Sequence, residues 1–242
     1  MVPGGHAHVS ASSLNKSIMH YFFPPNPRAV ALQPPAFVRL ERKDEFDAKE
    51  ISQALQKCSN HSAPGPDLVP YGVWKGIHTV NRHVIPKLIN HLLSWSIHLP
   101  LLKDLLGILL PKPAKGDYDA FASYRVIALM QTFSKIVERI INQRLIKFAK
   151  RNGLYSLRQT GSLPRRATFD VGISLRHWVQ EAQAASLKAT TMFLDIKGRF
   201  DNVDHSSLLW RLQTKSVPNY IVNWISNFIF YRQFAIVFPG SP

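Results

Sequence analysis

Residues 132–150 constrain the fold most, because they form the clearest helical pattern in the chain. Side chains three and four positions apart lie on one face of an α-helix. The apolar residues on that face are Phe133, Ile136, Val137, Ile140, Ile141, Leu145 and Phe148. Lys135, Arg139 and Lys150 lie off this face, and Gly153 suits the helix stop. Taken alone, the pattern predicts an amphipathic packing helix with a solvated charged side.

The remaining elements alternate irregularly between helix and strand. Helical spacing predicts helices over 43–58, over 71–95 with an interruption near Pro86, over 168–187, and in two stretches after His205. Short apolar runs predict strands at 105–110, 191–196 and 234–238. Helices mixed with isolated strands fit an α+β fold better than regular βαβ repeats.

Residues 1–40 contain no Asp or Glu and hold six of the 17 prolines, at positions 3, 24, 25, 27, 34 and 35. Such a sequence favours an extended arm with little fixed structure. The most apolar run, 99–110, is broken by Pro100, Lys103 and Asp104 and is shorter than the roughly 20 residues of a membrane span. The N-terminus also lacks the charged and apolar regions of a signal peptide. We expect no membrane partner.

The chain carries 30 Lys and Arg against 15 Asp and Glu, a formal net charge of +15. Basic surface releases condensed counterions when it binds nucleic acid, so phosphate backbone is the favoured partner; the alternative is a merely soluble basic protein. Between Lys135 and Arg166 the only acidic residue is Glu138. The basic residues there are Lys135, Arg139, Arg144, Lys147, Lys150, Arg151, Arg158, Arg165 and Arg166. A track this one-sided suits a template or primer strand.

A single cysteine, Cys58, excludes an internal disulfide and favours a reducing compartment. We therefore expect an intracellular protein, and the sequence leaves nucleus and cytoplasm open. The ten histidines lack the cysteine partners of a zinc site, so we interpret them as surface or core residues.

Residues 193–201 read FLDIKGRFD, a short apolar strand that ends in Asp195 and is followed by an aromatic ring at Phe200. A carboxylate on rigid backbone can hold Mg²⁺ against a triphosphate. The alternative is that the Asp only caps the next turn.

Other short segments accompany this one in order. Residues 62–67 read SAPGPD, 108–115 read ILLPKPAK, 123–129 read SYRVIAL, 159–161 read QTG and 166–170 read RATFD. With FLDIKGRFDNVDH at 193–205, they resemble the APGPDG, PKP, SYRPISL, QxGF, GRST and FLDIKKAFDRVDH segments of the reverse transcriptase domain of non-LTR (LINE-type) retrotransposons. The resemblance covers roughly 44–240. Group II intron maturases are the alternative family.

This resemblance implies the α+β fold of a right-hand polymerase. Fingers would occupy 41–190 and the start of the palm 191–242, following the arm at 1–40. It implies an RNA template, a DNA primer and a dNTP as partners, and Mg²⁺ as the cofactor, with Mn²⁺ as the alternative metal. The oligomeric state stays open.

By resemblance, Asp195 is the first palm aspartate and binds the catalytic metal, with the carbonyl of Ile196 as a further ligand. The backbone N–H groups of Gly198 and Arg199 would face the triphosphate of the dNTP. Phe200 matches the aromatic gate that excludes a ribose 2′-hydroxyl; the alternative is a core Phe. Asp201 and Asp204 are interpreted as turn and N-cap residues.

Arg125 is the candidate triphosphate clamp, supported by Lys112, because a guanidinium fork bonds two phosphate oxygens at once. Alternatively, Arg125 pairs with Asp117 or Asp119 and pins the loop. Gln159 and Arg166 fit template or nucleotide contacts. The remaining predicted nucleic-acid contacts are Lys135, Arg139, Arg144 and Lys147.

The sequence departs from the family pattern in two ways. Val126, Ser162, Arg165 and Arg199 replace a Pro, an aromatic residue, a Gly and a small residue, and a long cation at Arg199 conflicts with nucleotide binding in a tight turn. The sequence also contains no F/Y-x-D-D hairpin, and one carboxylate cannot hold two divalent ions about 3.5–4 Å apart.

We therefore expect a truncated domain that is inactive alone. One alternative is a non-catalytic remnant that binds RNA or DNA through the 135–166 track. The other is an open reading frame whose product does not fold, because the exposed edge of the Asp195 strand would promote aggregation.

Overall fold

The computed structural model describes residues 11–22, 40–95, 98–114, 116–156, 158–196, 203–230 and 232–237. The chain divides into two compact units. Unit 1 comprises Met1–Leu145 and Asp201–Pro242, and unit 2 comprises Ile146–Phe200. The functional division into fingers at 41–190 and palm at 191–242 stays a prediction.

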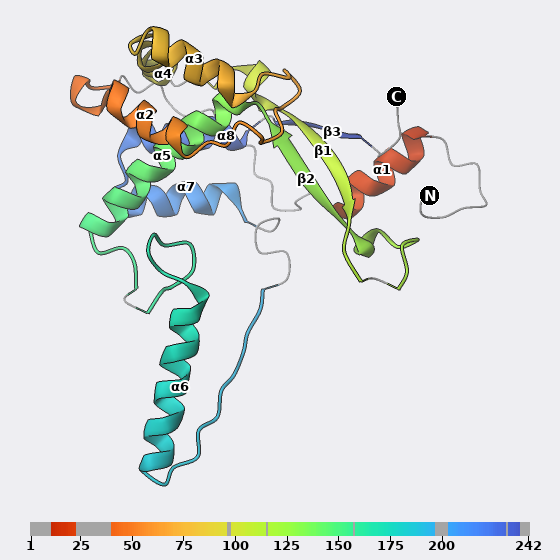
Figure 1. Cartoon of the computed structure of the whole chain (residues 1–242), viewed down its shortest axis with the longest axis vertical. Helices are drawn as coiled ribbons and strands as arrows, with labels where there is room; N and C mark the ends of the chain where they lie inside the picture. Colours follow the sequence, from red (N-terminus) through yellow and green to blue (C-terminus); the bar gives the residue numbers. More distant parts are fainter. Residues whose placement is uncertain are drawn as a thin grey trace. The chain divides into compact units, whose positions relative to one another are not determined.

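Unit 1 is built largely from helices (Figure 1). They are α2 (Ala48–Gln56), α3 (Tyr71–Val80), α4 (Val84–Ser94), the first part of α5 (Thr132–Arg151), α7 (His205–Thr214) and α8 (Asn219–Ile229). Short 3₁₀ turns lie at Arg42–Asp44, Pro100–Lys103 and Phe121–Ser123. The core side chains of these helices include Ile51, Leu55, Ile85, Ile89, Phe133, Ile136, Val137, Ile140, Ile141, Ile221, Val222 and Trp224. The predicted helix at 132–150 is thus confirmed, together with the burial of most of its apolar stripe.

The ends of the helices follow local rules that refine the sequence-based bounds. The helix expected from 43 begins at Ala48, because the Asp47 side chain caps it by accepting from the Glu50 N–H at 2.8 Å. The expected interruption near Pro86 lies instead at 81–83. Pro86 itself fits in the first turn of α4, where a helix needs no N–H donor. The predicted cap at Asp204 is confirmed by its hydrogen bond from the Ser207 N–H, 2.6 Å.

A three-stranded sheet completes unit 1. Its strands are β1 (Asp104–Pro111), β2 (Tyr124–Met130) and β3 (Gln233–Val237), in the order β2-β1-β3. β1 pairs antiparallel with β2 and parallel with β3. Gly107 leaves room for the Phe234 ring, which a Cβ at that position would overlap. The strand expected at 105–110 is confirmed, and so is the one at 234–238 as far as the described residues reach; β2 was not predicted as a strand.

The region expected to be an extended arm contains a helix, α1 (Ala11–Phe22). The six prolines of the arm all lie outside it, so nothing interrupts its hydrogen bonds. Ile18 is buried, and the Tyr21 ring lies 5.7 Å from the Phe121 ring beside β2. None of the helices in the described part of the chain has the length and apolarity needed to span a bilayer.

Unit 2 contains the end of α5, a loop, α6 (Thr168–Ala184) and an extended segment that returns alongside α6 (Figure 1). The helix expected at 168–187 is confirmed, ending slightly earlier. The strand expected at 191–196 is wrong: these residues are exposed and take part in no sheet among the described residues. A strand exists only with a hydrogen-bonded partner, and none of the described strands pairs with this segment.

Candidate nucleotide and nucleic-acid site

The β1–β2 hairpin positions the two predicted triphosphate contacts. Arg125 lies directly opposite Leu110, and Lys112 follows Leu110 by two residues. Because strand side chains alternate, Lys112 and Arg125 lie toward the same face of the hairpin as diagonal neighbours. The Lys112 N–H also donates to the Ser123 carbonyl at 2.8 Å, which extends the pairing past the end of β1. The structure therefore brings this predicted pair together.

Arg125 is exposed, and no ion pair engages it within the described part of the chain. The alternative pairing with Asp117 or Asp119 is not formed among the described residues, and Asp117 accepts from the Asp119 N–H at 2.7 Å. The Lys112 ammonium donates to the Ala122 carbonyl at 2.8 Å, so it is tied to the loop. The hairpin thus presents a guanidinium that can bind an anion, with an anchored lysine beside it.

Residues 62–67 pack against the start of α5. A Cβ on Gly65 would overlap the backbone of Met130 and Gln131, so only glycine permits this approach. The buried Thr132 hydroxyl accepts from Trp74 Nε1 at 2.8 Å and donates to the Val69 carbonyl at 2.7 Å. The close approach of Gly65 gives this segment an architectural role.

The basic track predicted over 135–166 divides at the boundary between the units. In unit 1, Lys135 and Arg139 are half-buried, and burial lowers the pKa of the Lys135 ammonium. The Lys135 Nζ lies 3.5 Å from the Ala63 carbonyl oxygen, at the edge of hydrogen-bonding distance. Arg139 Nε is buried without a hydrogen-bond partner in the described residues. These two side chains are only partly accessible to a nucleic-acid strand.

Arg144 does not fit the prediction of a nucleic-acid contact. Its Nε and Nη2 bond both carboxylate oxygens of Glu50, at 2.9 and 2.6 Å. Its Nη atoms also donate to the carbonyls of Asp44 and Glu45 and to the Tyr220 hydroxyl. The guanidinium is thus used inside the protein, so Arg144 is a structural residue. Its partner Glu50 is 94 positions away in sequence, and no local pattern signals the pair.

The part of the track in unit 2 is accessible. Its exposed side chains in the described residues are Lys147, Lys150, Arg151, Arg158, Gln159, Arg165 and Arg166. No acidic residue interrupts the sequence from Ile146 to Phe169. Gln159 donates to the Gly161 carbonyl at 3.3 Å, within its own loop. Unit 2 therefore carries the stronger positive face of the predicted track.

Asp195 and Ile196 are exposed and lie in the extended end of unit 2, whereas Lys112 and Arg125 belong to unit 1. Gly198, Arg199 and Phe200 fall outside the described residues, as does Asp201. Among the described residues no group of three His, Cys, Asp or Glu side chains could hold a metal ion. Within the described residues Asp195 is thus not part of such a group, and its role as a metal ligand stays a prediction.

Comparison with known proteins tests the resemblance. The sequence profile described as reverse transcriptase (RNA-dependent DNA polymerase) matches residues 110–240, more than half of the chain. The chain belongs to the reverse transcriptase family. The match includes Lys112, strand β2 with Arg125, the track in unit 2 and Asp195.

The curated relatives of this reverse transcriptase chain come from mobile elements. It is 25% identical over 196 residues to a probable RNA-directed DNA polymerase from transposon X-element of Drosophila melanogaster, covering 81% of this chain and 21% of the relative. It is 25% identical over 223 residues to the RNA-directed DNA polymerase from mobile element jockey of Drosophila funebris, covering 88% and 23%. It is 27% identical over 188 residues to the transposon TX1 uncharacterized 149 kDa protein of Xenopus laevis, covering 77% and 14%.

These matches confirm the resemblance to the reverse transcriptase domain of non-LTR retrotransposons. The chain spans about a fifth of the length of the X-element and jockey relatives. Reverse transcriptases as a family use divalent metal ions and act on a nucleic-acid template with dNTPs.

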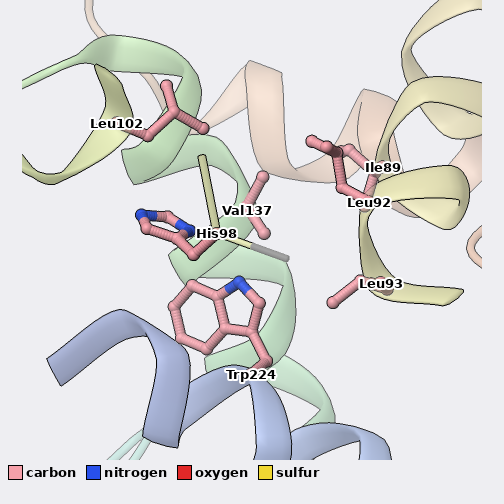
Figure 2. A pocket seen from close by; sticks show the side chains of 7 residues that line it. All are labelled: Ile89, Leu92, Leu93, His98, Leu102, Val137 and Trp224. Atoms are coloured by element: carbon pink, nitrogen blue, oxygen red, sulfur yellow. The ribbon is translucent and has the colours of Figure 1, made fainter. Parts of the chain in front are cut away.

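Two of the described histidines of unit 1, His78 and His98, are buried, in agreement with the core role considered for histidines. His98 lies beside a cavity of only about 10 Å³ (Figure 2), edge-on to the Trp224 ring at 5.9 Å. Burial, more than any neighbouring charge, lowers the pKa of His98 to about 4. A cavity of this size holds at most about one water. The site is therefore part of the reverse transcriptase core and not a ligand pocket.

Proposed function

We propose that this chain supplies the nucleotide- and template-contacting part of an RNA-directed DNA polymerase of a non-LTR retroelement. The family match across 110–240 carries the proposal, because Lys112, Arg125 and Asp195 all lie within it. In this proposal Arg125 clamps the triphosphate, with Lys112 beside it. The exposed cations of unit 2 hold the RNA template and DNA primer.

The metal-binding role of Asp195 belongs to the same proposal. One exposed carboxylate cannot bind two divalent ions, so Asp195 needs further carboxylates that the 242-residue sequence does not supply in a paired motif. We therefore expect no primer extension by the 242-residue chain on an RNA template with Mg²⁺ or Mn²⁺. Robust extension that disappears in Asp195→Ala would contradict this expectation.

Template binding can be tested apart from polymerisation. We expect the purified chain to bind a labelled RNA–DNA template–primer, with an affinity that falls steeply as salt rises. Lys147→Glu and Arg151→Glu should weaken binding and flatten the slope by about 0.7–0.9 for each lost phosphate contact. Lys49→Glu reverses an exposed charge on α2 and is the control. It should change the affinity and the salt slope less than either of these variants does. Identical losses in all three variants would indicate non-specific attraction.

A second candidate function, nucleic-acid binding without catalysis, is favoured by the exposed cations of unit 2. The two functions differ in their response to a nucleotide. If the hairpin is a triphosphate clamp, the complementary dNTP slows dissociation of the template–primer from the chain. Arg125→Lys then removes this effect and leaves the affinity for the template–primer without dNTP unchanged. If dNTP has no effect on the wild-type complex, the non-catalytic function is the better one.

We also propose an intracellular location, on the basis of the single buried Cys58. Fractionation of cells that express the tagged chain would decide between nucleus and cytoplasm, and recovery from the medium would contradict the proposal.

A further inference from the structure

A groove between α2 and α3 in unit 1 is not used by any role described so far. Its volume is about 370 Å³, within the range of small-ligand sites. Its walls are Ser52, Leu55 and Gln56 from α2, Lys75, His78 and Thr79 from α3, and Arg82 from the turn after α3. It shares no residue with the hairpin or with the basic track.

The groove is positively charged. No Asp or Glu is among its lining residues, whereas Lys75 and Arg82 are both cations. The Lys75 ammonium donates one hydrogen bond to the Cys58 carbonyl at 2.7 Å, which fixes its position and leaves two protons for another acceptor. Arg82 is exposed, and no described carboxylate forms an ion pair with it. The α2 carboxylate of Glu50 is neutralised by Arg144.

His78 adds an unsatisfied polar atom to the wall. The side chain is 7% exposed, and Nε2 lies 2.7 Å from the Ser52 hydroxyl. That hydroxyl already donates its proton to the Ala48 carbonyl at 2.8 Å, so Nε2 carries the hydrogen of the His–Ser bond. Burial, and next the charge of Arg82, lower the pKa of His78, which keeps the ring neutral near pH 7. Nδ1 is then a bare acceptor with no hydrogen-bond partner in the described residues.

We propose that this groove binds a phosphate group, held by the Lys75 ammonium, the Arg82 guanidinium and the Gln56 amide. A guanidinium fork and an ammonium without a carboxylate between them are the donors that phosphate oxygens require. The groove stands independently of the proposed polymerase function, because its residues take no part in that site. A small phosphate ligand and the phosphodiester of a nucleic acid both offer oxygens to these donors, but only a phosphate that keeps a proton can also donate to His78 Nδ1.

Inorganic phosphate is the first probe. Thermal unfolding of the whole chain would be followed against phosphate concentration at constant ionic strength, with chloride replaced. We expect saturable stabilisation, an apparent Kd at least about tenfold weaker in Arg82→Gln, and one within about twofold of wild type in Lys87→Gln. Lys87 is an exposed α4 lysine outside the groove, so the two variants lose the same charge. No saturation, or equal weakening in both variants, would overturn the proposal.

A short single-stranded RNA distinguishes the two sources of phosphate. If phosphate competes with RNA on the wild type, and Arg82→Gln weakens both ligands, the groove binds a nucleic-acid backbone. If Arg82→Gln weakens phosphate and leaves RNA affinity unchanged, the ligand is a small phosphate compound. Because the RNA track in unit 2 is intact in Arg82→Gln, a failure here leaves the proposed polymerase function untouched.

Discussion

The guanidinium of Arg144 ties α5 to the chain before α2, and replacing it by Met should destabilise unit 1 strongly. Besides its two bonds to Glu50, the guanidinium carbon lies 3.6 Å from the centre of the Phe46 ring. Burial alone would lower the pKa of Arg144, but the hydrogen bonds with Glu50 and Tyr220 outweigh it and raise that pKa. The ion pair is therefore a stabilising contact in the folded state.

The size of the effect follows from the burial of the pair. The side chains of Arg144 and Glu50 are only 15% and 21% exposed, so removing the arginine leaves a largely buried carboxylate without its partner. Breaking a buried pair in this way costs about 3–5 kcal/mol. For a chain of this size each kcal/mol corresponds to roughly 2–4 °C, so we expect a fall in Tm of about 6–20 °C.

Urea unfolding followed by circular dichroism would measure the free energy of unfolding of Arg144→Met. Arg151→Met is the matched control, since Arg151 is an exposed arginine at the end of the same helix and should change stability by less than about 0.5 kcal/mol. Similar losses in the two variants would refute the structural role. If Arg144→Met instead kept full stability and lost RNA affinity, Arg144 would be the nucleic-acid contact that the charge pattern predicted.

Three further predictions concern the core of unit 1. Gly65→Ala should destabilise the fold by about 2–3 kcal/mol in urea unfolding, because the added Cβ would overlap the backbone of Met130 and Gln131. Gly76→Ala should stabilise the fold by about 0.5–1 kcal/mol, because Gly76 lies in a helix and its added Cβ would have no atom within 4 Å. Equal effects would contradict the close packing at Gly65. Thr132→Val should cost about 1–3 kcal/mol by the same measurement, since it leaves Trp74 Nε1 without its acceptor; a neutral result would show that the bond is replaced. The pKa of His98 is about 4 in the folded state and 6.5 in the unfolded state, so between pH 6.5 and pH 4 the unfolded state binds more protons. The free energy of unfolding should therefore fall by about 3 kcal/mol as the pH drops from 6.5 to 4. A His98→Phe chain that loses stability as steeply as wild type over this range would contradict the assignment.

Local patterns in the sequence predicted the elements whose stability is local. The stripe through Phe133 and Ile140 specified α5, and Asp204 specified the start of α7, because both signals act within a few residues. The prediction at 191–196 failed since a strand depends on a partner that its own residues do not encode. The charge pattern likewise placed Arg144 on a track, but burial beside Glu50 is decided by distant parts of the chain.

The candidate site was predictable in its residue types and not in its environment. The motif segments selected Arg125 and Lys112, and the hairpin that joins them follows from the pairing of β1 with β2. The His78 groove had no signal in the sequence, because its walls come from two helices whose packing sets the spacing of Lys75 and Ser52.

The order of strands in the sheet has a consequence during synthesis on the ribosome. β1 can pair with β2 as soon as the hairpin emerges, but its other edge is covered by β3, which begins at Gln233. At roughly 5–20 residues per second, translation of the intervening chain takes on the order of ten seconds. Throughout that time the nascent polypeptide exposes the N–H and C=O groups of an apolar strand, which is when a chaperone would be needed most.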